Sequence, residues 1–294
     1  MTALRLAMFN ADTPVLALRA KYMTYGAIFH ELLVAAAKRI TPSVTVTSRN
    51  FDIVQQEYPD DITAFDGIII SGSGSSSYDD NMWIKTLDDY IWRVYRDYRQ
   101  VKLFGGCFGH QIICQSLLRP FGVVVEKDPN GWEIGVHEVD IDEEFRKAFG
   151  SATETMSQGR TSPISSPTEP GQTNPSSILN RLPSRLRLQF IHADSVMLPP
   201  SGFPKGWTGF GKSAKCSVQG AYQPRRVLTY QGHFEFDRLI NSEIVKAFRD
   251  KWDPQTVQQF LEDIDADDDS LGAAEILLKF LLEEPCLKSL QCKV

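Results

Sequence analysis

Short runs of aliphatic and β-branched residues recur along the chain, each bounded by Gly, Pro, Asp or Asn, which is typical of strands. They cover residues 4–9, 43–47, 67–70, 102–104, 122–125, 186–191 and 227–230. Amphipathic helical patterns lie between several of them. In the clearest, apolar residues three or four positions apart from Trp83 to Tyr98 share one face. This alternation predicts an α/β fold in which helices cover both faces of a central, mostly parallel sheet.

Two stretches depart from this pattern. Residues 157–177 are mainly Ser, Thr, Pro, Gly, Gln and Asn, which bury too little apolar surface to offset the entropy lost on ordering. We expect a flexible surface insertion there, with an ordered lid as the alternative. After about residue 250, an acidic stretch leads into the apolar helical pattern AAEILLKFLLEE. We therefore expect one domain over residues 1–250 and a C-terminal helical extension, 251–294, packed on it.

The composition narrows the class of protein. Of 294 residues, 42% are hydrophobic and 23% are charged, as in a globular chain, and the net charge of −6 has the wrong sign for binding a phosphate backbone. No apolar run approaches the roughly 18 residues that span a membrane, and because the first residues lack a long apolar stretch and a small-residue cleavage site, we expect no signal peptide. We expect a cytoplasmic protein that binds neither nucleic acid nor membrane. Its five cysteines are irregularly spaced, so a reactive thiol is more plausible than a disulfide framework.

One cysteine lies where a nucleophile would be expected. In KLFGGCFGHQIICQSL, an apolar strand, a glycine-rich turn and a helical run follow one another. This order is typical of a nucleophile elbow, in which Gly105, Gly106 and Gly109 permit a strained turn and Cys107 stands at a helix N-terminus that favours the thiolate. The alternative is a small buried side chain, which is how we interpret Cys114.

A base and an orienting group occur later in the chain. In VLTYQGHFEFD, His233 and Glu235 are two positions apart in an apparently extended segment. Residues at this spacing point the same way in a strand, so the carboxylate can hold the imidazole from behind. Alone, such a pair is usually a polar strand edge. Together with Cys107, it completes the set of groups that cysteine catalysis needs.

The motifs GGCFGHQ and QGHFEF together resemble those of the class I glutamine amidotransferases, usually G-x-C-x-G-x-Q and Q-x-H-P-E. ISGSGSSSYDDNMWI, NGWEIGVHEVDI and HADSVMLP resemble, more narrowly, the stand-alone GMP-synthase-like branch and the plant γ-glutamyl peptidases. The resemblance implies a flavodoxin-like α/β sandwich and a Cys107–His233–Glu235 triad. It further implies that Cys107 attacks a γ-glutamyl amide to form a thioester, with His233 acting first as acid and then as base.

The resemblance also implies residues that hold the substrate. The family's oxyanion hole corresponds to the backbone N–H groups of Phe108 and of the Gly72–Ser73 turn. Gln111 corresponds to a position near the substrate's α-carboxylate, and Asp194 is expected to hold the α-amine. Helix packing is the alternative role for Gln111, and a turn is the alternative for Asp194.

The chain departs from the family pattern at two positions. Phe234 replaces the usual proline between histidine and glutamate, so the geometry of the triad must rely on packing rather than on a fixed φ. Gly106 replaces the usual aliphatic residue before the cysteine, and we expect it to enlarge the space beside the thiolate. Either change is consistent with a different substrate.

Three other patterns in the sequence lack the residues or the context that their functions require. Residues 206–213 match the phosphate-binding pattern G-x-x-x-x-G-K-[ST] but follow a proline-rich segment and precede no helix. The acidic run from Asp263 to Asp269 lacks the glycine and glutamate of a calcium loop, so we interpret it as a solvated helix start. The histidines show no metal-ligand spacing. We expect neither a metal nor a cofactor.

Three functions remain open. The first is cysteine-dependent hydrolysis of γ-glutamyl C–N bonds, of the glutaminase or amidotransferase type, with water or a separate synthetase subunit as the ammonia acceptor. The second is a γ-glutamyl peptidase acting on glutathione-type conjugates, or a hydrolase repurposed in specialised metabolism. The third is a non-catalytic binding protein with the same fold. The retention of Cys107, His233 and Glu235 argues against the third.

Overall fold

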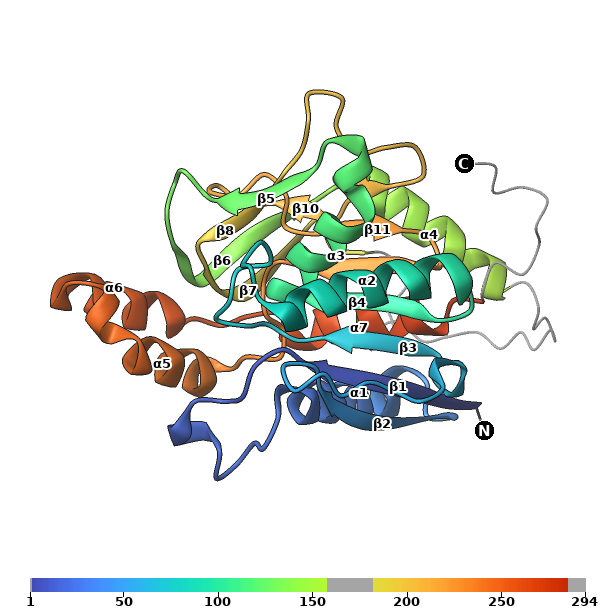
Figure 1. The fold of residues 1–294 in the computed structure, drawn as a ribbon, viewed down its shortest axis with the longest axis horizontal. Helices are drawn as coiled ribbons and strands as arrows, with labels where there is room; N and C mark the ends of the chain where they lie inside the picture. Colours follow the sequence, from blue (N-terminus) through green and yellow to red (C-terminus); the bar gives the residue numbers. More distant parts are fainter. Residues whose placement is uncertain (1, 158–181, 285–294) are drawn as a thin grey trace, which may run out of the picture.

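The computed structural model describes residues 2–157 and 182–284, which are arranged around a seven-stranded sheet (Figure 1). Its order is β2 (Val44–Asp52), β1 (Thr2–Asn10), β3 (Gly67–Ile70), β4 (Lys102–Gly106), β12 (Val227–Tyr230), β11 (Ala221–Gln223) and β9 (Thr208–Gly209). Neighbours from β2 to β12 are parallel, whereas β11 pairs antiparallel with β12 and β9. The predicted α/β fold with a mostly parallel sheet is confirmed.

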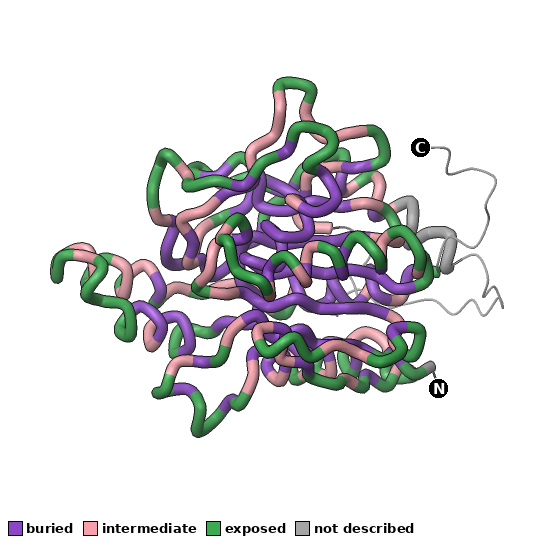
Figure 2. Tube along the Cα trace, in the orientation of Figure 1, coloured by how far each residue is buried: buried purple, intermediate pink, exposed green. Residues whose placement is uncertain are grey.

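Helices pack on both faces of this sheet. Leu6 and Met8 of β1 belong to the hydrophobic cluster that includes α1 (Tyr25–Ile40) and α7 (Ser270–Leu282). Ala7 and Phe9 belong to the cluster on the other face, with α2 (Met82–Asp97) and α3 (Phe108–Leu118). The alternation of β1 side chains therefore divides the core into two layers. The buried segments gather along the central strands in Figure 2.

Smaller sheets complete the fold. β10 (Gly211–Lys212), β6 (Glu133–Ile141) and β7 (Arg185–His192) form one antiparallel sheet, and β5 (Val124–Lys127) pairs with β8 (Asp194–Met197). The segment 206–213 forms β9 and β10 rather than a phosphate loop. Helix α4 (Glu143–Ser157) follows β6, and beyond Ser157 the expected insertion lies outside the described residues.

The last helices leave the sheet and then return to it. α5 (Arg238–Ala247) and α6 (Pro254–Ile264) lie together at one end of the molecule (Figure 1). Short 3₁₀ helices occur at Leu16–Leu18, Ile62–Ala64, Arg119–Phe121 and Arg249–Lys251. Within the two ranges that the structure covers, no helix has the length and apolarity needed to cross a membrane.

The expectation of an acidic helix start is only partly correct. α6 ends at Ile264 and α7 begins at Ser270, so most of the acidic run lies in the loop between them. There Arg238 binds Asp265 at 2.9 Å and also binds Asp267. The charges therefore fasten this loop to α5, while Asp269 alone occupies a helix N-cap.

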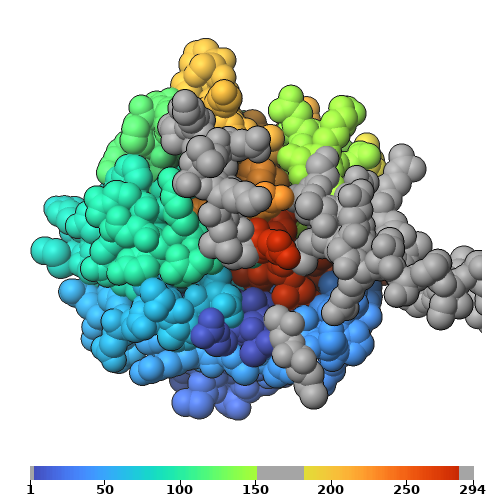
Figure 3. Space-filling model, turned by 90° about the vertical axis from the view of Figure 1, so that its right-hand side faces the viewer, coloured from blue at the N-terminus to red at the C-terminus, as the bar shows by residue number. Residues whose placement is uncertain are grey.

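A buried lysine fixes the end of α7 to the sheet. Lys102, at the start of β4, donates from Nζ to the backbone carbonyl of Leu281 at 2.8 Å and to that of Glu283. Burial lowers the pKa of Lys102 to about 8, although the nearby Glu283 carboxylate opposes this shift. A cation is well suited to the free carbonyls at a helix C-terminus. In Figure 3, the red end of α7 lies between the blue N-terminal part below it and an orange segment above it.

The junction between β4 and α3 leaves no room for side chains at two glycines. A Cβ atom at Gly105 would lie 2.2 Å from the carbonyl carbon and oxygen of Gly109, and one at Gly109 would lie 2.4 Å from the Ile70 oxygen. At Gly106 the nearest atom would be Phe29 Cζ, at 3.6 Å, which is an ordinary contact. Strand, turn and helix therefore meet backbone to backbone at Gly105 and Gly109.

This difference between neighbouring glycines is testable. We expect Gly105→Ala to lower the free energy of unfolding by about 3 kcal/mol, because the added methyl group overpacks a backbone contact. The matched control Gly106→Ala should change it by less than about 1 kcal/mol. Urea unfolding followed by tryptophan fluorescence measures both. Equal effects of the two substitutions would contradict the close packing of Gly105 against the Gly109 backbone.

Candidate active site

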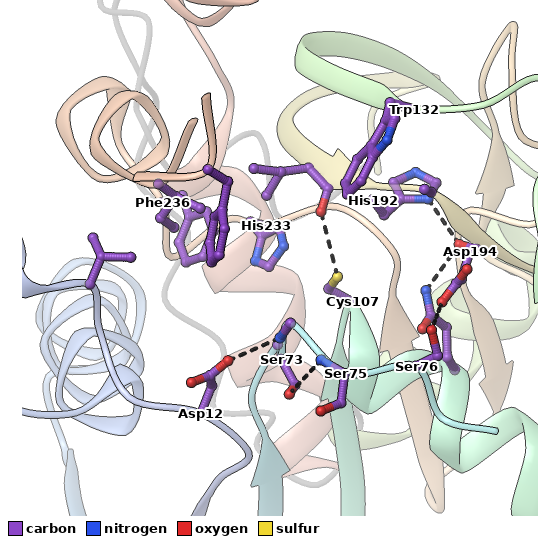
Figure 4. Close-up of a pocket in the computed structure, with 18 of the residues that line it drawn as sticks. Asp12, Ser73, Ser75, Ser76, Cys107, Trp132, His192, Asp194, His233 and Phe236 are labelled. Atoms are coloured by element: carbon purple, nitrogen blue, oxygen red, sulfur yellow. Dashed lines mark hydrogen bonds between the residues drawn. The ribbon is translucent and has the colours of Figure 1, made fainter. Parts of the chain in front are cut away.

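Cys107 occupies a strained turn between β4 and α3. Its φ is 51°, in the left-handed region that residues with a side chain rarely adopt. Its N–H donates to the Tyr230 carbonyl at 2.8 Å, and its carbonyl accepts from the Gln111 N–H at 3.0 Å. The thiol therefore stands at the N-terminus of α3, and its Sγ lies 4.0 Å from the Ile191 carbonyl oxygen (Figure 4). This is the elbow geometry that the sequence predicts.

His233 and Glu235 form a buried pair just beyond β12. His233 Nδ1 lies 2.7 Å from Glu235 Oε1, and both side chains are almost fully buried. The segment is not a strand as expected: its pairing is an isolated bridge, with the His233 N–H donating to the Gln189 carbonyl at 2.8 Å. The two side chains nevertheless point the same way. The Phe236 ring stacks on the imidazole, with centroids 3.9 Å apart.

Phe234, which stands where the family has proline, anchors this segment in the core. It is almost fully buried, and its ring centroid lies 5.3 Å from that of Phe29, 5.9 Å from Phe104 and 6.1 Å from Tyr230. Aromatic packing of this kind stabilises the fold beyond the area that it buries. The geometry between His233 and Glu235 therefore rests on packing, as predicted.

The environment of His233 favours its protonated form. Burial opposes protonation, but the negative charges of the Glu235 carboxylate and the Cys107 sulfur outweigh it and raise the pKa of His233 to about 10. Nε2 of the same ring has no hydrogen-bond partner among the residues that the structure describes. The imidazole can thus exchange a proton through Nε2 while Nδ1 is held by Glu235.

A cavity of about 330 Å³ joins these groups. It is lined by loops at the carboxyl ends of four parallel strands, and these loops contribute Asp12, Gly72, Ser73, Cys107 and His233. A Cβ atom at Gly72 would lie 2.9 Å from His233 Cε1 and 3.6 Å from Cys107 Cβ, so this loop packs directly against both groups. Ligands of open α/β sheets bind at this end of the strands.

Gln111 and Asp194 line the same cavity. Gln111 Nε2 donates to the Asp194 carbonyl at 3.0 Å and to Gln231 Oε1 at 3.1 Å. The Asp194 carboxylate accepts from Ser76 Oγ at 2.5 Å and from the Tyr78 hydroxyl at 3.0 Å. These bonds tie the loop after β3 to the start of β8. They make the side of the cavity next to Asp194 polar.

Two other positions named from the sequence lie just behind the cavity. The Phe108 side chain is buried and packs against Trp83, with ring centroids 5.3 Å apart. It therefore points away from the cavity, and the part of Phe108 next to Cys107 is its backbone. Glu235 is covered by His233 and does not line the cavity.

The expectation for Gly106 is wrong. A Cβ atom there would meet Phe29, Phe104 and Glu235, at distances from 3.6 to 4.0 Å, and Gly106 does not line the cavity. Because neighbouring positions at the end of β4 face opposite sides, the space at Gly106 opens towards the core and not beside the thiolate. A larger substrate gains no room from this glycine.

Sequence reasoning missed a second buried imidazole–carboxylate pair in the cavity wall. His192 Nε2 lies 2.9 Å from Glu133 Oε2, and His192 Nδ1 lies 3.0 Å from the Asp194 carbonyl oxygen. Glu133 also accepts from Gln219 and Ser213. Burial opposes ionisation, but these hydrogen bonds outweigh it and hold the pKa of Glu133 below its usual value. No local motif links His192 to Glu133.

An aromatic wall was also missed. It consists of Trp132, before β6, and of Phe236, Phe248 and Trp252, which come from the region of α5 and α6. Each is an ordinary apolar residue in the sequence, so no signal connects them. The tertiary structure brings them to one cavity.

The other described cysteines lie in the interior. Cys114 is fully buried, and burial raises its pKa to about 12. Cys216 is buried beside Ser195, and burial again raises the thiol pKa. Cys107 differs because it lines the cavity. Within residues 2–157 and 182–284, no group of three or more His, Cys, Asp or Glu side chains is arranged to hold a metal ion.

Comparison with known proteins identifies the family. The model for class I glutamine amidotransferases matches residues 23–248. The chain belongs to this family. A glutamine amidotransferase-like protein of Schizosaccharomyces pombe is 27% identical over 95% of this chain and 98% of its own length. Gamma-glutamyl peptidase 4 of Arabidopsis thaliana is 36% identical over 67% of this chain and 64% of its own length.

Solved structures of amidotransferases share the fold. A glutamine amidotransferase from Thermotoga maritima superposes with a TM-score of 0.61 at 16% identity, covering 95% of this chain and 98% of that one. One from Methylobacillus flagellatus gives 0.57 at 17% identity, covering 96% and 92%. The flavodoxin-like sandwich expected for a class I amidotransferase is confirmed.

The pairing of His233 with Glu235 predicts a pH dependence of stability. The pKa of His233 is raised from 6.5 to about 10, so the stabilisation is fully present below about pH 6.5 and is lost as the pH rises through about 10. We expect the free energy of unfolding of the wild type to exceed that of Glu235→Gln at pH 6.5, and we expect this difference to be smaller at pH 10. Denaturant titrations at both pH values measure it.

The matched control is Glu138→Gln, which removes the carboxylate of an exposed pair with Arg185. Its effect should be small at either pH, because exposed ion pairs contribute little. An advantage over Glu235→Gln that stays constant across the range would contradict the raised pKa of His233.

Proposed function

We propose that this class I glutamine amidotransferase cleaves γ-glutamyl C–N bonds through a thioester on Cys107. The observation that carries the proposal is one shared cavity lined by a thiol at a helix N-terminus and by an imidazole whose Nδ1 is bound to a buried carboxylate. Nucleophile, base and orienting group in this order are what covalent cysteine catalysis requires.

In the first half-reaction, the Cys107 thiolate, which faces the protonated His233, attacks the γ-carbonyl carbon, and Sγ bonds to that carbon. The backbone N–H groups of Phe108 and of the Gly72–Ser73 turn would stabilise the negative oxygen that forms. As the C–N bond breaks, His233 donates its Nε2 proton to the leaving nitrogen and becomes neutral. An amine or ammonia departs, and the glutamyl group remains on sulfur.

In the second half-reaction, water attacks the thioester carbon while His233 takes one of its protons. The C–S bond breaks, Sγ leaves as the thiolate beside the protonated His233, and glutamate is released as its new carboxyl group loses a proton to solvent. Glu235 orients the imidazole throughout and stabilises its protonated form. Gln111 and Asp194 are suited to the α-carboxylate and α-amine of the substrate, because they line the polar side of the cavity.

Two versions of this activity differ in the leaving group. A glutaminase releases ammonia, either to water or to a separate synthetase subunit. A γ-glutamyl peptidase releases an amino acid or peptide, and the similarity to several γ-glutamyl peptidases of Arabidopsis thaliana favours this second candidate. A non-catalytic binding role is disfavoured because Cys107, His233 and Glu235 are all present.

A γ-glutamyl electrophile tests the shared mechanism. We expect 6-diazo-5-oxo-norleucine to add once to the protein, on Cys107, as measured by intact-protein mass spectrometry and fragment spectra. Cys107→Ala should abolish both the adduct and turnover, by at least about a thousandfold. The control Cys114→Ala, in the helix that follows Cys107 but outside the cavity, should keep both.

Glu235→Gln should reduce turnover without abolishing it, because Cys107 and His233 remain. A folded Cys107→Ala variant that turns over at the wild-type rate would overturn the proposal. So would a wild-type thiol that reacts with iodoacetamide while no γ-glutamyl electrophile or substrate reacts, since the cavity would then be built for another acyl group.

Product analysis separates the two candidates. We expect release of an amino acid from γ-glutamyl dipeptides to exceed release of ammonia from glutamine in kcat/KM. Enzyme-coupled ammonia detection and chromatographic amino acid analysis measure the two products. Faster ammonia release would instead assign the protein as a glutaminase.

A further inference from the structure

The cavity has two chemically different ends on either side of Cys107. Asp194 and Ser76 lie on one side, whereas His233 and Phe236 lie on the other (Figure 4). Phe248 and Trp252 also line the cavity, and Trp132, which lies above Cys107 next to His192 in Figure 4, contacts Trp252. The aromatic end of the cavity is therefore a wall that extends from Phe236, beside His233, to Trp132, and the polar end lies around Asp194.

The position of His233 decides which end holds the leaving group. A general acid must reach the nitrogen whose bond to the γ-carbon breaks, so the departing amine lies on the His233 side of Cys107. The glutamyl part then extends the other way, where Gln111 and Asp194 offer polar contacts. It follows that the aromatic end faces the leaving amine.

The residues of the aromatic end contact one another. Trp132 and Trp252 meet edge to face with centroids 5.1 Å apart, and both side chains remain partly exposed. The Lys251 ammonium lies 4.7 Å from the Phe248 ring centroid and 5.8 Å from that of Trp132. Ammonia needs no such wall. Aromatic rings favour a flat apolar group, and the lysine favours a negative charge beside it.

We infer that this end of the cavity is a subsite for leaving amines that carry an aromatic side chain and a carboxylate. The substrate class is then γ-glutamyl-linked aromatic amino acids. The inference rests on the proposed function, because it assumes attack by Cys107 on a γ-glutamyl carbonyl. It adds Trp132, Trp252 and Lys251 as residues that determine specificity.

A substrate series on the wild-type protein tests the subsite without any substitution. We expect kcat/KM for γ-glutamyl-phenylalanine to exceed that for γ-glutamyl-alanine by about tenfold or more, since a filled apolar pocket discriminates to that extent. An equal or higher value for γ-glutamyl-alanine would overturn the inference.

Substitutions locate the preference. Trp132→Leu and Trp252→Leu should each lower the ratio of the two kcat/KM values severalfold. The matched control is Trp92→Leu, because Trp92 is exposed on α2 and lies away from the cavity, and it should leave the ratio unchanged. Thermal unfolding confirms that each variant is folded. A ratio that survives both cavity substitutions in folded protein contradicts the assignment.

The role of Lys251 is tested by removing the charge from the lysine or from the substrate. Lys251→Met should lower kcat/KM for γ-glutamyl-phenylalanine about threefold, a modest effect because the ammonium is exposed. It should not affect γ-glutamyl-phenethylamine, which has the ring but no carboxylate. Equal loss with both substrates would remove Lys251 from the subsite.

Failure of the inference can be told apart from failure of the proposed function. If glutamine or γ-glutamyl-alanine is hydrolysed through a Cys107 adduct and γ-glutamyl-phenylalanine is not preferred, only the subsite is wrong. If no γ-glutamyl compound forms an adduct or turns over, the proposed function is wrong and the subsite falls with it.

Discussion

The left-handed backbone of Cys107 is the constraint on which the arrangement of the site depends. Such a conformation costs about 1–3 kcal/mol and persists only where its surroundings enforce it. Here Gly105 and Gly109 let β4 and α3 approach backbone to backbone, and the Cys107 N–H is bound to the Tyr230 carbonyl of β12. Because β12 leads directly into the segment of His233, the pairing of β4 with β12 determines the position of both the thiol and the imidazole.

The position of His233 depends on side-chain packing, whereas the position of Cys107 depends on backbone geometry. His233 is held by a bridge to Gln189, by the Glu235 carboxylate and by the flat stack of Phe236. Phe234 points the other way into the aromatic core and prevents the segment from rotating. A proline would fix one backbone angle through its covalent ring. The phenylalanine achieves a comparable restriction through contacts with side chains from α1, β4 and β12.

The sequence predicted those features whose cause is local. The strands Gly67–Ile70 and Val227–Tyr230 were predicted with their observed limits because each is a short apolar run between turn residues. The elbow and the pairing of His233 with Glu235 depend on neighbours within a few positions. The orientation of Gly106, the partner of His192 and the aromatic wall were not predictable, because each depends on segments far apart in the chain. Trp132 and Trp252, for example, meet only after β6 and α6 have packed.

Two buried imidazole–carboxylate pairs border the cavity, and the two imidazoles differ in the number of ring nitrogens that have a hydrogen-bond partner. His192 faces an acceptor at each ring nitrogen, Glu133 at Nε2 and the Asp194 carbonyl at Nδ1. Both ring nitrogens of His192 are therefore engaged with other residues of the cavity wall. His233 is bound to Glu235 at Nδ1, whereas its Nε2 has no partner in the described part of the chain. The free Nε2 therefore fits the proton exchange with the thiol that we propose for His233, whereas the hydrogen bonds of His192 connect Glu133 to the loop of Asp194.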